Sequence, residues 1–230
     1  MNRKRSLIAL GIVLLLIIPA VSFAEIQLFV TKNYVKLFDP KINNWSVLNN
    51  FSPKGWRTSN NLALVWNNND AYVYDIWLHQ WMPQTDIRPI FGLVSDYLAM
   101  VKCADAVYVY DVGQKQWKSL LDIQPKNISI SRQLAAVLTR DSIYVYDSVL
   151  HRWTSQEDVG PTAMVLSDMM LLAWSRDSAY IYDTTLHQWM IKENIQPLSG
   201  MIEPTRALVY TTEYIYEYSP YTHRWKRRAR

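Results

Sequence analysis

The chain has 230 residues and carries 24 basic against 20 acidic side chains, with a single cysteine. Arg3, Lys4 and Arg5 lie ahead of an apolar stretch, and from residue 25 onward the count is 21 basic against 20 acidic. That balance argues against a nucleic-acid or anionic-membrane surface. One cysteine, Cys103, excludes an intrachain disulfide, and a domain of this length folds without one. We expect a partly buried structural thiol; an intermolecular disulfide is the alternative.

The first 24 residues have the layout of a secretory signal peptide. Leu7 to Ile18 is a continuous apolar run, Pro19 breaks it, and Ser22-Phe23-Ala24 offers small residues for cleavage. We therefore expect a mature domain, residues 25–230, that is secreted or periplasmic. The apolar stretch is also about long enough to span a bilayer, so an uncleaved membrane anchor formed by residues 7–24 is the alternative. We expect no other membrane contact.

From residue 26 onward the chain repeats itself every 36 residues. A tryptophan recurs at Trp45, Trp81, Trp117, Trp153, Trp189 and Trp225. Six positions earlier come Asp39, Asp75, Asp111, Asp147 and Asp183, with Ser219 in the last repeat. We expect the tryptophans to be core residues and the aspartates to cap turns through their side-chain oxygens.

Each repeat reads as four short strands with turn residues between them. In the third repeat we expect strands at 91–95, 97–102, 107–110 and 116–120. Four antiparallel strands per repeat predict an all-β fold, a β-propeller of about six blades. The first repeat begins with its second strand, so one blade is incomplete. A three-stranded blade could close the ring, the terminal segments could rearrange to complete it, or further blades could be missing.

The segment from Leu37 to Trp45 resembles the second half of a kelch repeat, and Val73 to Trp81 repeats it. The resemblance covers the whole mature chain and implies a kelch-like propeller, related to the galactose oxidase type. The chain departs from the family in lacking the double glycine after the second strand, where Lys102-Cys103 and Leu138-Thr139 stand. Its period is also shorter than the ~50 residues of kelch repeats.

Equivalent positions on different blades do not converge on one site. The four histidines, His79, His151, His187 and His223, all lie two residues before a repeat tryptophan. We expect them at turns, packed or solvated beside tryptophan, because zinc needs ligands ~2 Å from one centre. The repeat aspartates are likewise too dispersed for glycoside chemistry. We therefore expect no metal, no cofactor and no catalysis; a site at the central channel with Arg57 and Glu203 is the enzymatic alternative.

The leading hypothesis is an exported scaffold that binds another protein. Kelch usage implies contact through the strand 2–3 and strand 4–1 loops, where we single out Arg88, Arg140, Glu157, Asp158 and Arg176. A carbohydrate-binding propeller is the alternative. Trp66 and Trp174 share one repeat position and could form a sugar platform, although we favour packing between blades for them. The basic C-terminal segment from Arg224 is interpreted as a solvated tail, with a contact patch for an acidic partner as the alternative.

Overall fold

The structure is a computed structural model that describes residues 26–230. The predicted signal peptide or anchor lies outside these residues. Within the described part, no helical segment has the length and hydropathy that a membrane crossing requires.

In the described residues, twenty-three strands form six antiparallel sheets, five of four strands and one of three, and each sheet is one blade. The first three blades are β1 (Gln27–Val30), β2 (Tyr34–Asp39), β3 (Asn44–Asn49); β4 (Gly55–Thr58), β5 (Leu62–Trp66), β6 (Ala71–Asp75), β7 (Gln80–Gln84); and β8 (Phe91–Val94), β9 (Leu98–Lys102), β10 (Ala106–Asp111), β11 (Gln116–Leu121). The fourth and fifth are β12 (Asn127–Ile130), β13 (Leu134–Leu138), β14 (Ile143–Asp147), β15 (Arg152–Gln156); and β16 (Ala163–Leu166), β17 (Met170–Trp174), β18 (Ala179–Asp183), β19 (Gln188–Lys192). The sixth is β20 (Ser199–Glu203), β21 (Arg206–Tyr210), β22 (Tyr214–Ser219), β23 (Arg224–Ala229).

Successive strands pair along each blade, so the chain runs outward from the first strand to the fourth. In blades two to six, the register places the tyrosine next to the end of each third strand opposite the tryptophan of the fourth strand, as in the Tyr110–Trp117 pair. Side chains alternate between the two faces of a strand. The second strands of blades two, four and five are buried along their whole length, because a blade lies on each side of them.

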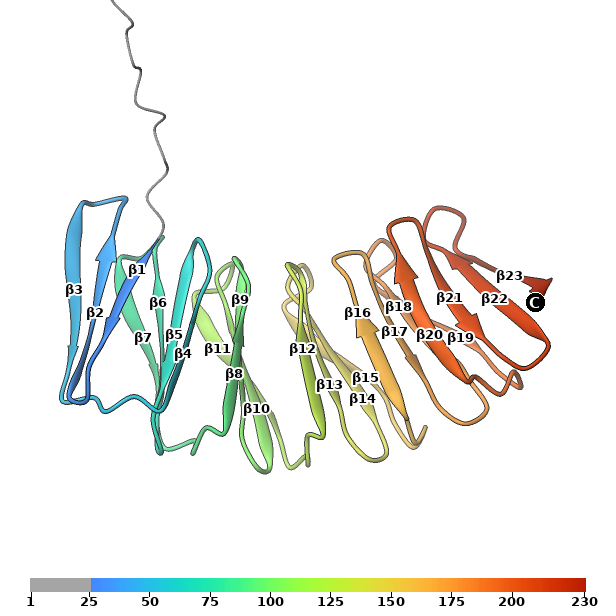
Figure 1. Cartoon of the computed structure of the whole chain (residues 1–230), viewed down its shortest axis with the longest axis horizontal. Coiled ribbons are helices and arrows are strands. Elements are labelled where there is room, and N and C mark those ends of the chain that lie inside the picture. The colour runs from blue at the N-terminus through green and yellow to red at the C-terminus, as the bar shows by residue number, and fades with distance from the viewer. Residues whose placement is uncertain (1–25) are drawn as a thin grey trace, which may run out of the picture.

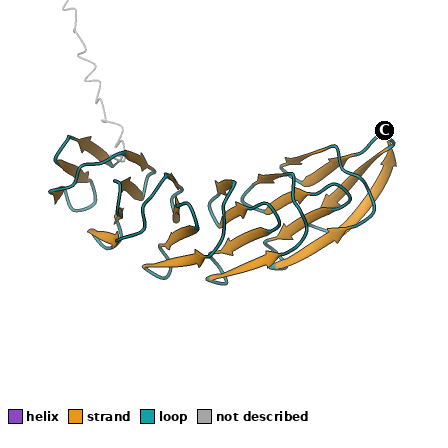
Figure 2. Cartoon of the chain, turned by 90° about the horizontal axis from the view of Figure 1, so that it is seen from below, coloured by secondary structure: helices purple, strands orange, loops and turns teal. Residues whose placement is uncertain are grey.

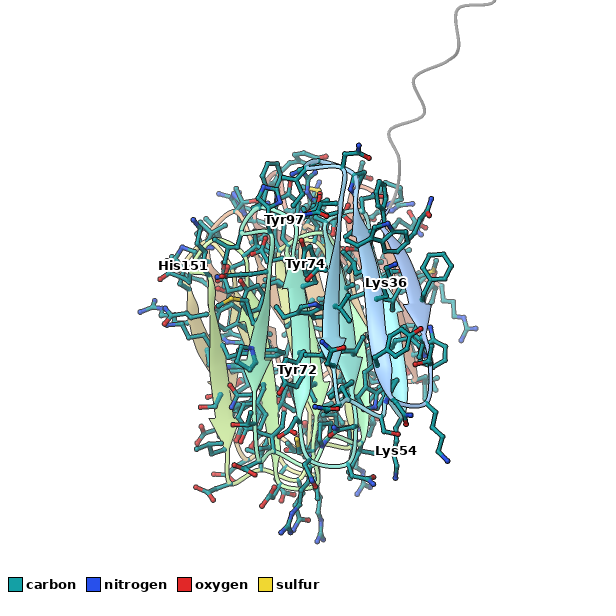
Figure 3. All side chains as sticks on the ribbon, turned by 90° about the vertical axis from the view of Figure 1, so that its left-hand side faces the viewer. Lys36, Lys54, Tyr72, Tyr74, Tyr97 and His151 are labelled. Carbon is teal, nitrogen blue, oxygen red and sulfur yellow. The ribbon has the colours of Figure 1, made fainter. Side chains whose placement is uncertain are left out.

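The six blades stand side by side in a row, with the first and sixth at opposite ends (Figure 1). Seen from below, the row bends into an arc (Figure 2). In blades two to six the first strands contact one another in succession, as β4 does β8 and β16 does β20. Figure 3 faces the first blade, with Lys36 on the near sheet and Tyr72 and Tyr74 on the second blade.

The core consists of the layers between adjacent blades. Between blades two and three, Leu64 and Trp66 pack with Val101 and Tyr110 in one buried cluster. The ring of Trp66 fits because the next blade has Gly92 on its first strand: a Cβ there would come within 2.6 Å of Leu64 and 2.9 Å of Trp66. Gly200 makes the same space for Trp174. Glycine is needed at these two positions for the close approach of a neighbouring ring.

The fold prediction is confirmed: the protein is an all-β, propeller-type array of six antiparallel blades, and the first blade is the incomplete one. The strands expected in the third repeat match β8 to β11 within two residues. The C-terminal basic segment is solvated, as expected, but it is a paired strand and not a tail. Residues 224–229 form β23, whose pairing with β22 holds Arg227 over the ring of Tyr214, 4.5 Å from its centroid.

Candidate binding site at the loop edge

Two kinds of loop meet along one edge of the array, which we call the loop edge: the turns between the second and third strands, and the loops from each fourth strand to the next blade. Backbone hydrogen bonds join them. The Ile87 N–H donates to the Asn69 carbonyl over 2.8 Å, and the Ile195 N–H donates to the Asp177 carbonyl over 3.0 Å. Equivalent bonds recur between blades, so the edge is a regular, fixed surface.

The loops that join successive blades have their own backbone pattern. A buried isoleucine, such as Ile87, follows a residue with positive φ, here Asp86 at 58°. Aspartate or asparagine holds this slot in each such loop from blade two onward because both tolerate the left-handed region. Asp158, with φ of 56°, occupies the same slot. The backbone conformation therefore explains why residue 158 is an aspartate. It does not explain the arginine at position 88, where φ is 50°.

All five residues predicted for binding are exposed on the loop edge. Arg140 and Arg176 lie on the turns of blades four and five, and Glu157 and Asp158 lie on the loop between those blades. These four therefore share one region of the edge. Arg88 follows blade two and lies apart from them.

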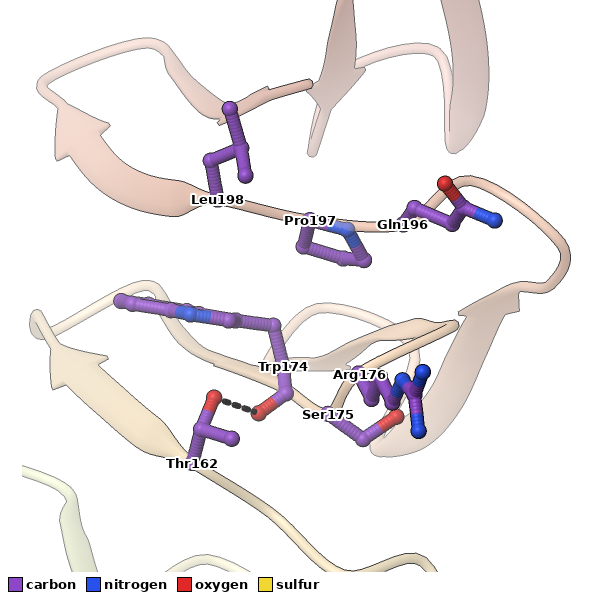
Figure 4. Close-up of a pocket in the computed structure, with 7 residues that line it drawn as sticks. All are labelled: Thr162, Trp174, Ser175, Arg176, Gln196, Pro197 and Leu198. Atoms are coloured by element: carbon purple, nitrogen blue, oxygen red, sulfur yellow. Dashed lines mark hydrogen bonds between the residues drawn. The ribbon is translucent and has the colours of Figure 1, made fainter. Parts of the chain in front are cut away.

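Arg176 lines an open groove of about 600 Å³ between blades five and six (Figure 4). Its other lining residues are Thr162, Trp174, Ser175, Gln196, Pro197 and Leu198. The Thr162 hydroxyl donates to the Trp174 carbonyl over 3.0 Å and fixes one wall. The groove thus combines one cation, an amide and apolar surface, which suits an extended polar polypeptide with an acidic group.

A second groove occupies the repeat-equivalent place between blades three and four. Its volume is about 440 Å³, and Arg140, Asp105, Gln124, Pro125 and Lys126 are among its lining residues. Gln124 and Gln196 hold the same repeat position, directly before the recurring proline. Sequence reasoning missed both glutamines and Lys126, although their place beside that proline marked them as loop residues.

The repeat aspartates act across the seams, by which we mean the contacts between adjacent blades. One oxygen, Oδ1, caps the local turn as expected: Asp147 Oδ1 accepts from the Val149 N–H over 2.8 Å. The other, Oδ2, accepts the hydroxyl of the tyrosine on the next blade. These bonds measure 2.7–2.9 Å and join Tyr74 to Asp39, Tyr110 to Asp75, Tyr146 to Asp111, Tyr182 to Asp147 and Tyr218 to Asp183.

The histidines belong to the same network, which the sequence interpretation missed. In four of the five seams, a histidine Nδ1 lies 2.7–3.0 Å from the same Oδ2: His79 at Asp39, His151 at Asp111, His187 at Asp147 and His223 at Asp183. Lys115 takes the histidine position in the seam between blades two and three. The prediction that the histidines do not converge is consistent with the described residues, where no cluster of metal-ligating side chains occurs.

Burial and hydrogen bonding oppose each other at these carboxylates. Burial raises the pKa of Asp147, but the bonds from His187, Tyr182 and two backbone N–H groups outweigh it, so the pKa lies below its ordinary value. The pKa values of Asp39 and Asp183 are lowered against burial in the same way. Burial, followed by the bond to Asp147, raises the pKa of Tyr182 far above its ordinary value. The network is therefore built for a charged carboxylate and neutral tyrosines.

A signal for this network was present in the pattern of exceptions. Within residues 26–230 no blade stands before the first repeat, and there Phe38 and Asn43 replace the tyrosine and the histidine. Within the same residues no blade stands after the last repeat, and there Ser219 replaces the aspartate. Each exception falls where the partner across the seam is missing, which indicates pairing between repeats.

The tryptophan prediction needs correction. The tyrosines are the fully buried rings, whereas five of the repeat tryptophans are half-buried and Trp45 is 40% exposed. Each tryptophan lies on the fourth strand, where it meets the tyrosine of its own blade, as in the Tyr182–Trp189 pair at 5.3 Å. Trp66 and Trp174 are only 6% and 9% exposed, which confirms packing between blades and leaves little ring surface for a sugar.

The residues of the enzymatic alternative do not meet. Arg57 lies on β4 in blade two and Glu203 on β20 in blade six, where Glu203 pairs with Arg206. The proposed channel site is therefore not formed. Cys103 is 1% exposed, more deeply buried than expected, and burial raises the pKa of its thiol to about 12.

Neither a protein-family model nor a curated protein matches this chain. Among solved structures, Kluyveromyces lactis Hsv2 is 10% identical with a TM-score of 0.43, covering 85% of this chain and 71% of that one. Kluyveromyces marxianus Hsv2 is 12% identical with a TM-score of 0.41; the match covers 74% of this chain and 62% of that one. The N-terminal domain of Nup159 is 11% identical with a TM-score of 0.43, covering 85% and 67%. At these TM-scores the similarities carry no argument about function.

Proposed function

We propose that this protein is an exported, kelch-like propeller scaffold that binds another protein through the loop edge. The observation that carries the proposal is the pair of open grooves beside the repeat-equivalent loops at Gln124 and Gln196. Arg176 lines one groove from the turn of the preceding blade, and Arg140 lines the other from the turn of the following blade. Export rests on the layout of residues 1–24. The kelch-like assignment rests on the resemblance in blades two to five, where tyrosine and aspartate end the third strand and tryptophan follows at the start of the fourth.

Nothing in the architecture requires Arg140 or Arg176. Arg140 is strongly exposed and its nearest acidic group, Asp141, is 3.8 Å away and also exposed. Such a surface pair contributes little to stability. These arginines are therefore free to bind acidic groups of a partner. Glu157 and Asp158 lie between them and would pair with a basic group, which fixes how the partner is aligned on the surface.

The test is a double charge reversal, Arg140→Glu with Arg176→Glu, in a purified protein used to capture partners from the extract of its native host. We expect loss of captured protein, identified by mass spectrometry. The matched control reverses Lys115 and Arg132, exposed cations on the opposite edge, and should capture normally. Photo-cross-linking from position 176 then identifies the direct contact. Equal capture by both double variants would refute the loop edge as the binding surface.

A further inference from the structure

The outer face of the first blade is apolar and carries one central cation. Strand β2 turns Val35 and Leu37 toward blade two, where both are buried, so Lys36 and Phe38 lie on the other face. Figure 3 looks onto this face, with Lys36 on the near sheet. Phe38 lies 5.2 Å from the ring of Trp45, and Lys36 Nζ lies 4.2 Å from the same ring.

The outer face of the sixth blade is charged instead. On β22, Tyr216 and Tyr218 face blade five, which leaves Glu217 on the outside. Arg206 bonds Glu217 over 3.2 Å and Glu203 over 2.6 Å, so Glu217 is the acid at the centre of this face. Lys226 lies opposite Glu217 on the adjacent strand, and Arg224 and Arg228 share its face of β23.

The existing seams show which positions of two stacked blades come together. In the seam between blades five and six, Ile181 and Met190 of blade five share one apolar cluster with Tyr216 and Trp225 of blade six. The outer face of blade six presents the residues that lie one repeat later in the sequence. Glu217 holds the position of Ile181, and Lys226 holds the position of Met190. In the first repeat, the positions of Tyr216 and Trp225 hold Lys36 and Trp45.

These exceptions are complementary. Among the six repeats, Lys36 is the one cation in a position otherwise held by tyrosine. Glu217 is the one acid in a position otherwise held by leucine, valine or isoleucine. Stacking the sixth blade on the first would bring the lysine to the glutamate. It would also bring Lys226 to the face of Trp45, a cation–π contact.

The hydrogen-bond network is also compatible with such a seam. Phe38 has no hydroxyl, Asn43 has no imidazole and Ser219 has no carboxylate. Because donor and acceptor are lost together, the new seam would leave neither a buried carboxylate nor a buried phenol unpaired. Removing both partners of a buried hydrogen bond is far less costly than removing one.

We propose that the protein associates head to tail, the sixth blade of one copy stacking on the first blade of a second copy. Within one chain the two faces lie at opposite ends of the row and do not meet (Figure 1). The face that contacts the first blade therefore belongs to a second copy of the chain. The association continues the seam repeated five times inside the chain and leaves the loop edge free. A heterologous contact of this kind closes into a ring or extends into a filament.

The test uses Lys36→Glu and Glu217→Lys, each alone and then mixed, with mass measured by light scattering and sedimentation against concentration. Wild-type protein should form multiples of the chain mass. Each variant alone places like charges at every junction and should weaken association about tenfold or more. In the mixture, each variant supplies the charge that the other needs, so association should return. Lys115→Glu, an exposed reversal away from both faces, should associate as wild type.

Circular dichroism and thermal melting establish that the variants fold, which exposed charges should permit. Recovery in the mixture supports the head-to-tail contact. A wild-type protein with the mass of one chain at every concentration overturns it. Variants that lose association but do not recover on mixing also overturn it, because closure within one chain or a face-to-face dimer cannot be complemented in this way.

Discussion

The seam between blades two and three and the seam between blades four and five differ in one group. Both have the tyrosine–aspartate bond, 2.9 Å from Tyr110 to Asp75 and 2.8 Å from Tyr182 to Asp147. Only the latter has the histidine, with His187 Nδ1 at 2.7 Å from Asp147. In the other seam, Lys115 stands in that position and makes no side-chain hydrogen bond within residues 26–230.

The comparison separates what a seam requires from what reinforces it. The tyrosine–aspartate bond occurs in all five seams, so it is the common element. The histidine adds a second donor to a carboxylate that is already buried and bonded. In the seam without it, Trp66 and Cys103 contribute to an extensive apolar cluster that holds the blades together.

Acid should weaken several seams at once and is expected to have the largest effect. Asp39, Asp147 and Asp183 have pKa values below the ordinary 3.8 in the folded protein. Their contribution to stability is fully present above that value and is lost as the pH falls through the lowered pKa values, because the unfolded chain then binds more protons. Urea midpoints should therefore fall steeply below about pH 4. A midpoint that does not change on acidification would contradict the charged-carboxylate network.

Removing one carboxylate should be the most damaging single substitution. Asp147→Ala takes the acceptor from Tyr182, His187 and two backbone N–H groups, and the fully buried tyrosine hydroxyl is left unpaired. We expect a loss of about 3 kcal/mol in the free energy of unfolding. Asp105→Ala, at an exposed turn, is the control and should change stability by less than about 0.5 kcal/mol. Equal effects of the two substitutions would show that the network does not stabilise the seam.

Replacing the histidine of the seam between blades four and five by lysine, as in the seam between blades two and three, should lower the stability moderately. His187→Lys keeps the tyrosine–aspartate bond and removes the second donor from Asp147. Because His187 is partly exposed, we expect a loss of only about 1 kcal/mol in urea unfolding. In the Asp147→Ala background the same change should cost almost nothing. A full additive loss there would mean that the histidine acts through some other contact.

The reverse change should give the smallest effect, with the opposite sign. Lys115 has φ of 56° and His79 has φ of 55°, so histidine fits the backbone at position 115. Lys115→His should add a donor to Asp75 and stabilise the protein by about 0.5 kcal/mol. Lys115→Asn, which is too short to reach the carboxylate, should give no gain. Equal stabilisation by both would attribute the gain to backbone preference.

The repeat made the blades predictable because the Asp–Trp spacing and the turn residues are local signals. The same spacing predicted that Asp147 caps its own turn, which the Val149 N–H confirms. It did not reveal the second role of the carboxylate, because His187 lies 40 residues away on the next blade. That pairing depends on how blades stack, and the exceptions at Phe38 and Ser219 were its one trace in the sequence.

At the loop edge, Arg140 and Arg176 lie on the strand 2–3 turns where the sequence placed them, and their role in binding stays a prediction. The grooves beside them could not be foreseen, since each one depends on the relative placement of two blades. The same reason explains the misjudged tryptophans. Periodicity shows that Trp189 repeats, but only the fanning of the outer strands leaves it half-buried.

The open arc has a mechanical consequence. Because the two ends of the array lie far apart, tension applied to them loads the seams in series, and the first seam to part is the weakest one. The seam at Lys115 differs from the other four in lacking the histidine donor, although its apolar cluster is extensive. Each released 36-residue repeat, the offset that joins Asn60 to Asp96, adds about 120 Å of extended chain. When it is pulled from its ends, the protein should lengthen in steps of one repeat, and should not unfold in a single event.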